Sequence, residues 1–198
     1  WINVGPNMVS GGSHELNVVA YDWDGDGRAE VMLRGGDDMM VHGRKTSNAQ
    51  WTSDKDWPQR IGTKGVDTRR SVTHTANMTY TNTGGEYLVY MGGYTGVIYD
   101  AVRYMTYPIP RGSASDWGDA YGHRSSKYFF GAPFLDGKKP SVFLGRGIYT
   151  KHEMRTFDVN PSTHALTERW HWSNNGGWSD PWYANGNHNF CIADVDRD

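Results

Sequence analysis

The chain has 198 residues, with 20 Lys and Arg against 22 Asp and Glu, so its formal net charge is only −2. A charge this close to balance argues against a nucleic-acid-binding protein, which usually carries a clustered basic surplus. No apolar run approaches the roughly 18 residues that a membrane-spanning helix needs. The first residues do not have the pattern of a signal peptide. The single cysteine, Cys191, leaves the redox compartment open.

The composition predicts an all-β protein. Glycine supplies 25 residues and aromatic side chains 14% of the chain, while strong helix formers are scarce over any long window. Short β-branched runs separated by glycine-rich turns are typical of sheets with many connections.

A strand–loop–strand unit recurs along the chain. In its clearest form an apolar run is followed by an acidic loop, a second apolar run and a glycine pair. The three parts of this unit are residues 17–21, 22–30 and 31–36. A less regular copy covers 133–147, and a third copy begins with a predicted strand at residue 190. The second apolar run recurs without the acidic loop at 85–93.

The spacing of these units predicts a propeller. Aligning Glu30, Glu86 and Pro140 gives separations of 56 and 54 residues. A period near 55 residues suits a four-stranded propeller blade with some long loops, and further apolar runs at 96–104, 154–159 and 166–172 fit within it. Three to four such units fit in the chain. A two-sheet sandwich with coincidental spacing is the alternative.

The acidic loop has the residue types of a calcium site. Asp22, Asp24 and Asp26 alternate, and Glu30 follows at the ninth position. Calcium takes six to eight oxygen ligands, so we expect these four carboxylates and the backbone carbonyl of Arg28 to bind it. The alternative is a solvated acidic turn, in which four carboxylates would repel one another without a cation.

A second candidate site begins near the end of the sequence. Asp194, Asp196 and Asp198 have the same alternating spacing, with Arg197 where the first loop has glycine. We expect these three carboxylates to form part of another calcium site.

Several stretches resemble the bacterial rhamnogalacturonan lyases of polysaccharide lyase family eleven. The blocks Asp116-Trp117-Gly118-Asp119 and Gly186-Asn187-His188-Asn189 are the most specific. The other matching stretches are residues 21–31, 110–124, 134–137 and 146–150. The resemblance runs from about Ile2 to Asp198.

The resemblance implies an eight-bladed, calcium-bound β-propeller that cleaves rhamnogalacturonan I of pectin. Cleavage is by β-elimination at C4 of galacturonate and leaves an unsaturated uronate. The repeat count agrees with about half of such a ring, so we expect residues 1–198 to be part of a single propeller catalytic domain, incomplete at both ends. The resemblance places the general base beyond Asp198.

His188 is the residue that the resemblance places at the active-site calcium. Its neighbours Asn187 and Asn189 carry amides able to bind sugar hydroxyls or a metal. Without the resemblance, a buried and hydrogen-bonded histidine would be the favoured interpretation.

Other candidate substrate contacts have equally plain structural alternatives. Arg111 and Arg124 are expected to pair with uronate carboxylates, although each could be an inter-blade arginine. Trp178 and Trp182 are expected to stack on sugars, although aromatic side chains also fill propeller cores. Asp119 either binds calcium or caps a turn.

Departures from the family pattern at residues 35–40 and at His123 leave the preferred substrate and endo or exo action open. Alternative functions are a catalytically inactive carbohydrate-binding propeller and an integrin-like adhesion propeller. A glycoside hydrolase is a further alternative, but the sequence offers it no identifiable acid pair. We expect a monomer that acts on pectic polysaccharide and is secreted, periplasmic or at the cell surface.

Overall fold

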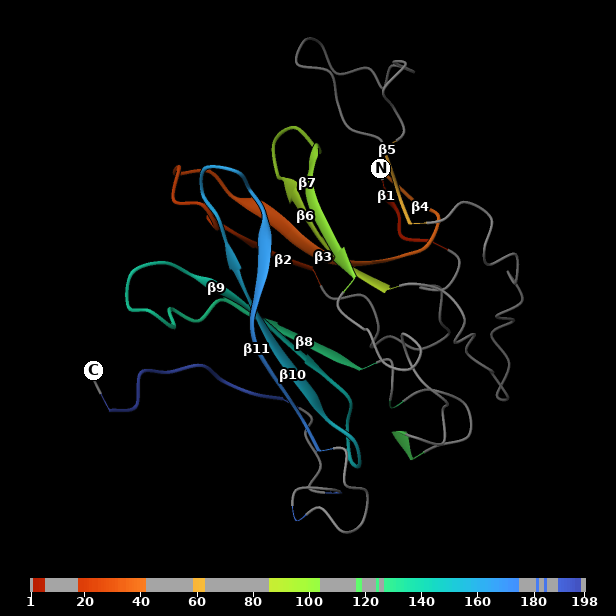
Figure 1. Cartoon of the computed structure of the whole chain (residues 1–198), viewed down its shortest axis with the longest axis vertical. Coiled ribbons are helices and arrows are strands. Elements are labelled where there is room, and N and C mark those ends of the chain that lie inside the picture. Colours follow the sequence, from red (N-terminus) through yellow and green to blue (C-terminus); the bar gives the residue numbers. More distant parts are fainter. Residues whose placement is uncertain are drawn as a thin grey trace.

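The computed structural model describes residues 2–5, 18–41, 59–62, 86–103, 117–118, 124, 127–174, 181, 184 and 189–196. The regular structure of these residues is all β, as the composition predicts: strands β1 to β11 form three antiparallel sheets (Figure 1). These ranges contain no α-helix, and hence no helix long and apolar enough to cross a membrane.

Two of the sheets have four strands. The first has the order β2 (Val18–Tyr21), β3 (Glu30–Gly36), β6 (Glu86–Gly92) and β7 (Ile98–Arg103). The second is a meander in reverse order, β11 (Leu166–Ser173), β10 (Glu153–Val159), β9 (Ser141–Arg146) and β8 (Tyr128–Gly131). The third, three-stranded sheet has the order β1 (Ile2–Asn3), β4 (Met39–Val41) and β5 (Gln59–Ile61).

The period near 55 residues is wrong. Strands β3 and β6 pair within one sheet, with Glu30 opposite Gly92 and Gly36 opposite Glu86, so Glu30 and Glu86 do not begin equivalent strands of successive sheets. Between them the chain leaves for the three-stranded sheet and forms β4 and β5 there. This excursion lengthens the β3–β6 connection and makes two neighbouring strands resemble separate repeats.

The strand predicted at residue 190 is also absent from the described residues. Residues 189–196 contain no strand. Phe190 instead packs its ring on Phe129 and Phe143, at centroid distances of 5.7 and 4.8 Å. The apolar pattern therefore places this segment against the second four-stranded sheet through side chains and not through a hydrogen-bonded ladder.

The three sheets are stacked with the first four-stranded sheet in the middle. Because side chains alternate along a strand, Met32 and Leu88 face the second four-stranded sheet, whereas Leu33 and Val89 face the three-stranded sheet. The core between the four-stranded sheets also contains Trp23, Tyr90, Trp117, Tyr128, Val142, Leu144, Phe157, Val159 and Leu166. Both faces of the middle sheet are thus covered (Figure 1).

A buried polar cluster joins the two four-stranded sheets. The Tyr128 hydroxyl donates to Glu86 Oε2 at 2.8 Å, and Arg146 Nη1 lies 3.4 Å from the same oxygen. The guanidinium carbon of Arg34 lies 3.5 Å from the centroid of the Tyr128 ring. All four side chains are buried, so this cluster anchors β6 of one sheet to β8 and β9 of the other.

Candidate metal centre and functional site

The loop between β2 and β3 is folded by its own carboxylates. Asp22 accepts hydrogen bonds from the backbone N–H groups of Gly25 and Gly27, at 2.8 and 2.9 Å, one on each oxygen. Both glycines have positive φ angles, 79° and 86°, which side-chain-bearing residues rarely adopt. Asp26 accepts from Arg28 N–H at 2.8 Å. The alternation of Asp and Gly therefore encodes a tight turn.

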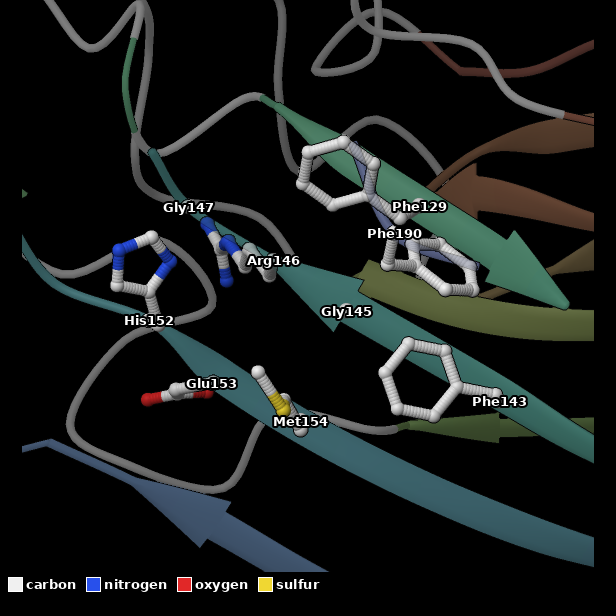
Figure 2. Close-up of a pocket in the computed structure, with 9 residues that line it drawn as sticks. All are labelled: Phe129, Phe143, Gly145, Arg146, Gly147, His152, Glu153, Met154 and Phe190. Atoms are coloured by element: carbon white, nitrogen blue, oxygen red, sulfur yellow. The ribbon is translucent and has the colours of Figure 1, made fainter. Parts of the chain in front are cut away.

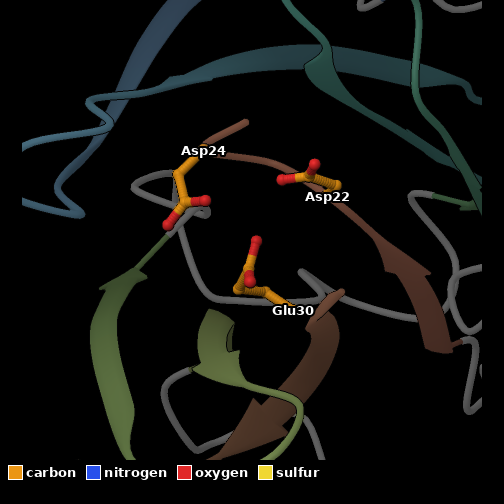
Figure 3. A group of neighbouring side chains, drawn as sticks. All are labelled: Asp22, Asp24 and Glu30. Atoms are coloured by element: carbon orange, nitrogen blue, oxygen red, sulfur yellow. The ribbon is translucent and has the colours of Figure 1, made fainter. Parts of the chain in front are cut away.

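Three of the predicted ligands meet at one point. Carboxylate oxygens of Asp22, Asp24 and Glu30 lie within 4.8 Å of one another (Figure 3). Asp26 is not a member of this group and is exposed, and Arg28 is also exposed. We call Asp22, Asp24 and Glu30 the carboxylate cluster.

Burial distinguishes Glu30 from the other two carboxylates. It is the first residue of β3 and only 3% exposed, and its Oε2 accepts the Trp23 N–H at 3.0 Å and the Tyr90 hydroxyl at 3.5 Å. Burial raises the pKa of Glu30; the Trp23 N–H opposes this, and the charges of Asp24, Asp26 and Asp22 add to it. The pKa of Tyr90 is also raised, chiefly by burial and then by the charge of Glu30.

The cluster has the chemistry that a hard divalent cation requires. Its ligand atoms are all carboxylate oxygens, and bringing them together in a partly buried site costs electrostatic free energy that a cation would offset. Calcium fits this set, with the remaining oxygens of its shell coming from backbone or water. Asp22, Asp24 and Glu30 are the residues that would hold it.

The sequence analysis missed a fourth side chain at the cluster. His164, in the turn between β10 and β11 of the second four-stranded sheet, places Nε2 3.1 Å from Asp24 Oδ2. A histidine in a turn 140 positions from Asp24 carries no local signal that the two residues meet.

An open cleft lies beside the carboxylate cluster. Its walls include Asp22, Asp24, Tyr21, Phe134 and Lys138. The rings of Tyr21 and Phe134 meet edge to face at 6.4 Å and remain 39% and 50% exposed. Exposed aromatic faces and a lysine beside an acidic loop form a surface able to contact an acidic sugar.

A smaller pocket lies where β9 ends and β10 begins (Figure 2). It is lined by Phe129, Phe143, Arg146, His152, Glu153 and Phe190, among others. His152 is buried, and burial lowers its pKa. Its backbone N–H donates to Asn174 Oδ1 at 2.6 Å, and Asn174 Nδ2 donates to the Thr150 carbonyl at 2.8 Å. These contacts make the pocket wall part of the packing of the second four-stranded sheet.

Arg124 is the one predicted uronate partner that the structure describes. Its Nη1 lies 3.5 Å from Thr150 Oγ1, and its guanidinium carbon is 5.1 Å from the centroid of the Tyr149 ring. It is half-buried. These two contacts are both with the connection between β9 and β10.

The remaining described candidates are exposed. Asn189 Oδ1 accepts the Phe190 N–H at 2.9 Å, and Asp194 and Asp196 belong to no group of three potential metal ligands in the described part of the chain. Seven predicted site residues lie outside the described residues. They are Arg111, Asp119, Trp178, Trp182, Asn187, His188 and Asp198.

Two of the sequence blocks behind the resemblance pack on each other. Trp117 is 1% exposed, its carbonyl accepts the Thr150 hydroxyl, and its ring lies 4.6 Å from the guanidinium carbon of Arg146. A side chain at Gly147 would collide with the Lys151 carbonyl oxygen and the Trp117 ring. The described residues of these two blocks are therefore in direct contact with each other.

Comparison with known proteins identifies the family. The model of the C-terminal domain of rhamnogalacturonan lyase family 11 matches residues 1–198. The chain is 32% identical over its whole length to the rhamnogalacturonan exolyase YesX and the rhamnogalacturonan endolyase YesW, both of Bacillus subtilis. It spans 28% of the length of each of these relatives.

Solved structures agree with this assignment. The crystal structure of the exotype rhamnogalacturonan lyase YesX superposes with a TM-score of 0.76 at 31% identity, covering 100% of this chain and 28% of that one. The Bacillus licheniformis rhamnogalacturonan lyase PL11 gives 0.67 at 30% identity, covering 88% of this chain and 26% of its own. The chain therefore belongs to rhamnogalacturonan lyase family 11.

Proposed function

We propose that this chain is part of an enzyme that degrades rhamnogalacturonan I of pectin by β-elimination, giving an unsaturated galacturonate end. The observation that carries the proposal is the match of one lyase family model over all 198 residues. The two curated relatives are named an exolyase and an endolyase and are equally similar to this chain, so both modes of cleavage stay open.

The chemistry requires removal of the C5 proton of a galacturonate residue. A calcium ion on the uronate carboxylate would withdraw charge and ease this step. We propose His188, Asn187 and Asn189 as the residues of this chain nearest the reacting sugar, with Arg111, Trp178 and Trp182 as further contacts. These assignments rest on the family resemblance. We propose no general base within residues 1–198.

We propose a structural role for calcium in the carboxylate cluster. Glu30 is buried and accepts the Trp23 N–H, and both oxygens of Asp22 accept backbone N–H groups, so these two ligands are held within the fold. Asp24 contacts His164 of the neighbouring sheet. A cation here would brace the loop where two sheets meet.

We also propose that the sheets are successive blades of an incomplete β-propeller. Each four-stranded sheet is antiparallel with its strands in chain order, which is the topology of a blade. The middle sheet is covered on both faces, whereas each sheet of a two-sheet sandwich has one outer face. We further propose a monomer that meets its polymeric substrate outside the cytoplasm.

The activity is tested with the full-length protein and rhamnogalacturonan I, by the absorbance of the unsaturated uronate. We expect this product in the wild type and its near-complete loss in His188→Ala, with an unchanged melting temperature because the role proposed for His188 is at the reacting sugar and not in packing. His171→Ala, at an exposed position of β11, is the control that should keep full activity. Binding without product would indicate an inactive carbohydrate-binding propeller, and cleavage to saturated ends a hydrolase.

A further inference from the structure

We propose that His164 is a positioning residue for the carboxylate cluster: from the neighbouring sheet it holds Asp24 in the conformation that binds a cation, and it thereby links cation binding to the packing of the two four-stranded sheets. This inference rests on the calcium site proposed above. It adds a residue from outside the acidic loop, and a purpose for the loop's position between the sheets.

The turn that carries His164 is well defined. The Asn160 N–H donates to the Ala165 carbonyl at 2.9 Å, and the His164 N–H donates to the Asn160 carbonyl at 2.8 Å. The Asn160 side chain accepts the N–H groups of Ser162 and Thr163. His164 itself has a φ of 58°, a conformation uncommon for residues other than glycine. The turn is thus closed by hydrogen bonds on both sides of the histidine.

This turn packs against the first four-stranded sheet. The His164 ring stacks on Tyr99 of β7, with centroids 4.3 Å apart and planes inclined by 17°, and lies edge to face with Tyr90 of β6 at 6.2 Å. Two residues after His164, the Leu166 N–H donates to Asp100 Oδ2 of β7 at 2.7 Å. The imidazole is therefore oriented by one sheet while its backbone belongs to the other.

The contact with Asp24 has the polarity of a ligand-orienting hydrogen bond. A carboxylate only accepts, so Nε2 of His164 is the donor to Asp24 Oδ2 at 3.1 Å. Asp24 Oδ1 accepts the Asp26 N–H, also at 3.1 Å. Both oxygens are thus held by one donor each, and each keeps lone pairs for a cation.

Tyr90 connects the His164 ring to the carboxylate cluster. Tyr90 contacts both the His164 ring and, through its hydroxyl, Glu30. Asp24 is therefore held by a residue of the turn between β10 and β11, and Glu30 by a residue that contacts this turn. Because linkage is reciprocal, a cation that favours this arrangement also stabilises the packing of the turn on the first sheet.

The chain offers a matched control. His171 Nδ1 also lies 3.1 Å from a carboxylate, that of Glu168, but both residues are on β11 and the histidine side chain is 59% exposed. A histidine–carboxylate pair of equal length is thus present outside the carboxylate cluster.

The experiment uses the full-length protein with Ca²⁺, and with Tb³⁺ as a luminescent probe excited through Trp23, which lies in the loop. Glu30→Gln identifies the signal of this site. His164→Phe keeps an aromatic ring against Tyr99 but removes the N–H donor, and His164→Ala removes both; His171→Phe is the control. Tb³⁺ affinity is measured by titration, and the melting temperature is measured in chelator and in excess Ca²⁺.

We expect His164→Phe and His164→Ala to weaken binding at this site by about tenfold or more, as loss of a ligand-orienting partner typically does. His171→Phe should bind as the wild type does. In chelator His164→Phe should melt above His164→Ala, while both should gain less than the wild type from Ca²⁺. If His164→Phe binds as tightly as the wild type, the histidine acts only through packing and this inference is overturned. If the wild type shows no Glu30-dependent signal, the calcium site itself fails.

Discussion

Glu30 is a buried carboxylate that lies close to other carboxylates, and both conditions disfavour its ionised form. It is 3% exposed, and its ionised form is opposed by burial and by the charges of Asp22, Asp24 and Asp26. The Trp23 N–H offsets part of this cost. An ionised Glu30 would therefore stabilise the folded state most when a cation lies beside it.

The effect of Glu30→Gln should accordingly change sign with calcium. In chelator the variant should melt at the same temperature as the wild type or higher, because a repelled charge is removed while the amide oxygen still accepts the Trp23 N–H. In excess Ca²⁺ the wild type should be the more stable, since a site filled at a hundred times its Kd stabilises by about 2.7 kcal/mol. Thermal melts of the full-length proteins measure both. A variant less stable in chelator and equally responsive to Ca²⁺ would contradict the cation site.

Strands β6, β8 and β9 are joined across the two four-stranded sheets by charge as well as by apolar packing. Glu86 and Arg146 are 1% and 3% exposed, and Tyr128 donates to the same glutamate oxygen. Removing one partner of a buried ion pair is costly because the other charge stays in a medium of low polarity.

Glu86→Gln should therefore destabilise the protein strongly, by about 3–5 kcal/mol. Arg169→Gln is the comparison, since Arg169 pairs with Asp158 at 3.2 Å where the side chains are 34% and 27% exposed, and its loss should cost about 1 kcal/mol or less. Urea unfolding of the full-length variants measures both values. Equal costs would mean that the buried pair does not hold the sheets together.

At the scale of the whole molecule, the described strands form a series of three sheets. The first four-stranded sheet has a core on each face, one shared with the second four-stranded sheet and one with the three-stranded sheet. In a propeller, sheets packed face to face in this way are arranged around a central axis.

An experimental structure of the full-length protein should show these three sheets as consecutive blades around a common axis, with further sheets completing the ring. It should also show density for a cation between Asp22, Asp24 and Glu30, with oxygen distances of about 2.3–2.6 Å. Two sheets closed on each other, with the outer faces exposed to solvent, would instead establish a sandwich.

Local patterns in the sequence determined the all-β class, the strands β2, β3, β6, β7, β9, β10 and β11, and the acidic loop, in which three of the four predicted carboxylates form the carboxylate cluster. These features depend on alternation within a strand and on spacing within one loop, which act over a few residues. The strands β1, β4 and β5 have two or three residues each and were not predicted, because so few positions show no clear alternation. The four-residue strand β8 was not predicted either.

Tertiary structure alone decided which strands and side chains meet. The β3–β6 pairing overturned the repeat period because a strand's partner is set by the chain path between them, and here that path visits another sheet. His164 reaches Asp24 only because two separate sheets are stacked. Arg124 lies beside Thr150 and Tyr149 because β8 and β9 are neighbours in one sheet. Contacts between distant segments depend on how sheets pack, and no short pattern in the chain records that arrangement.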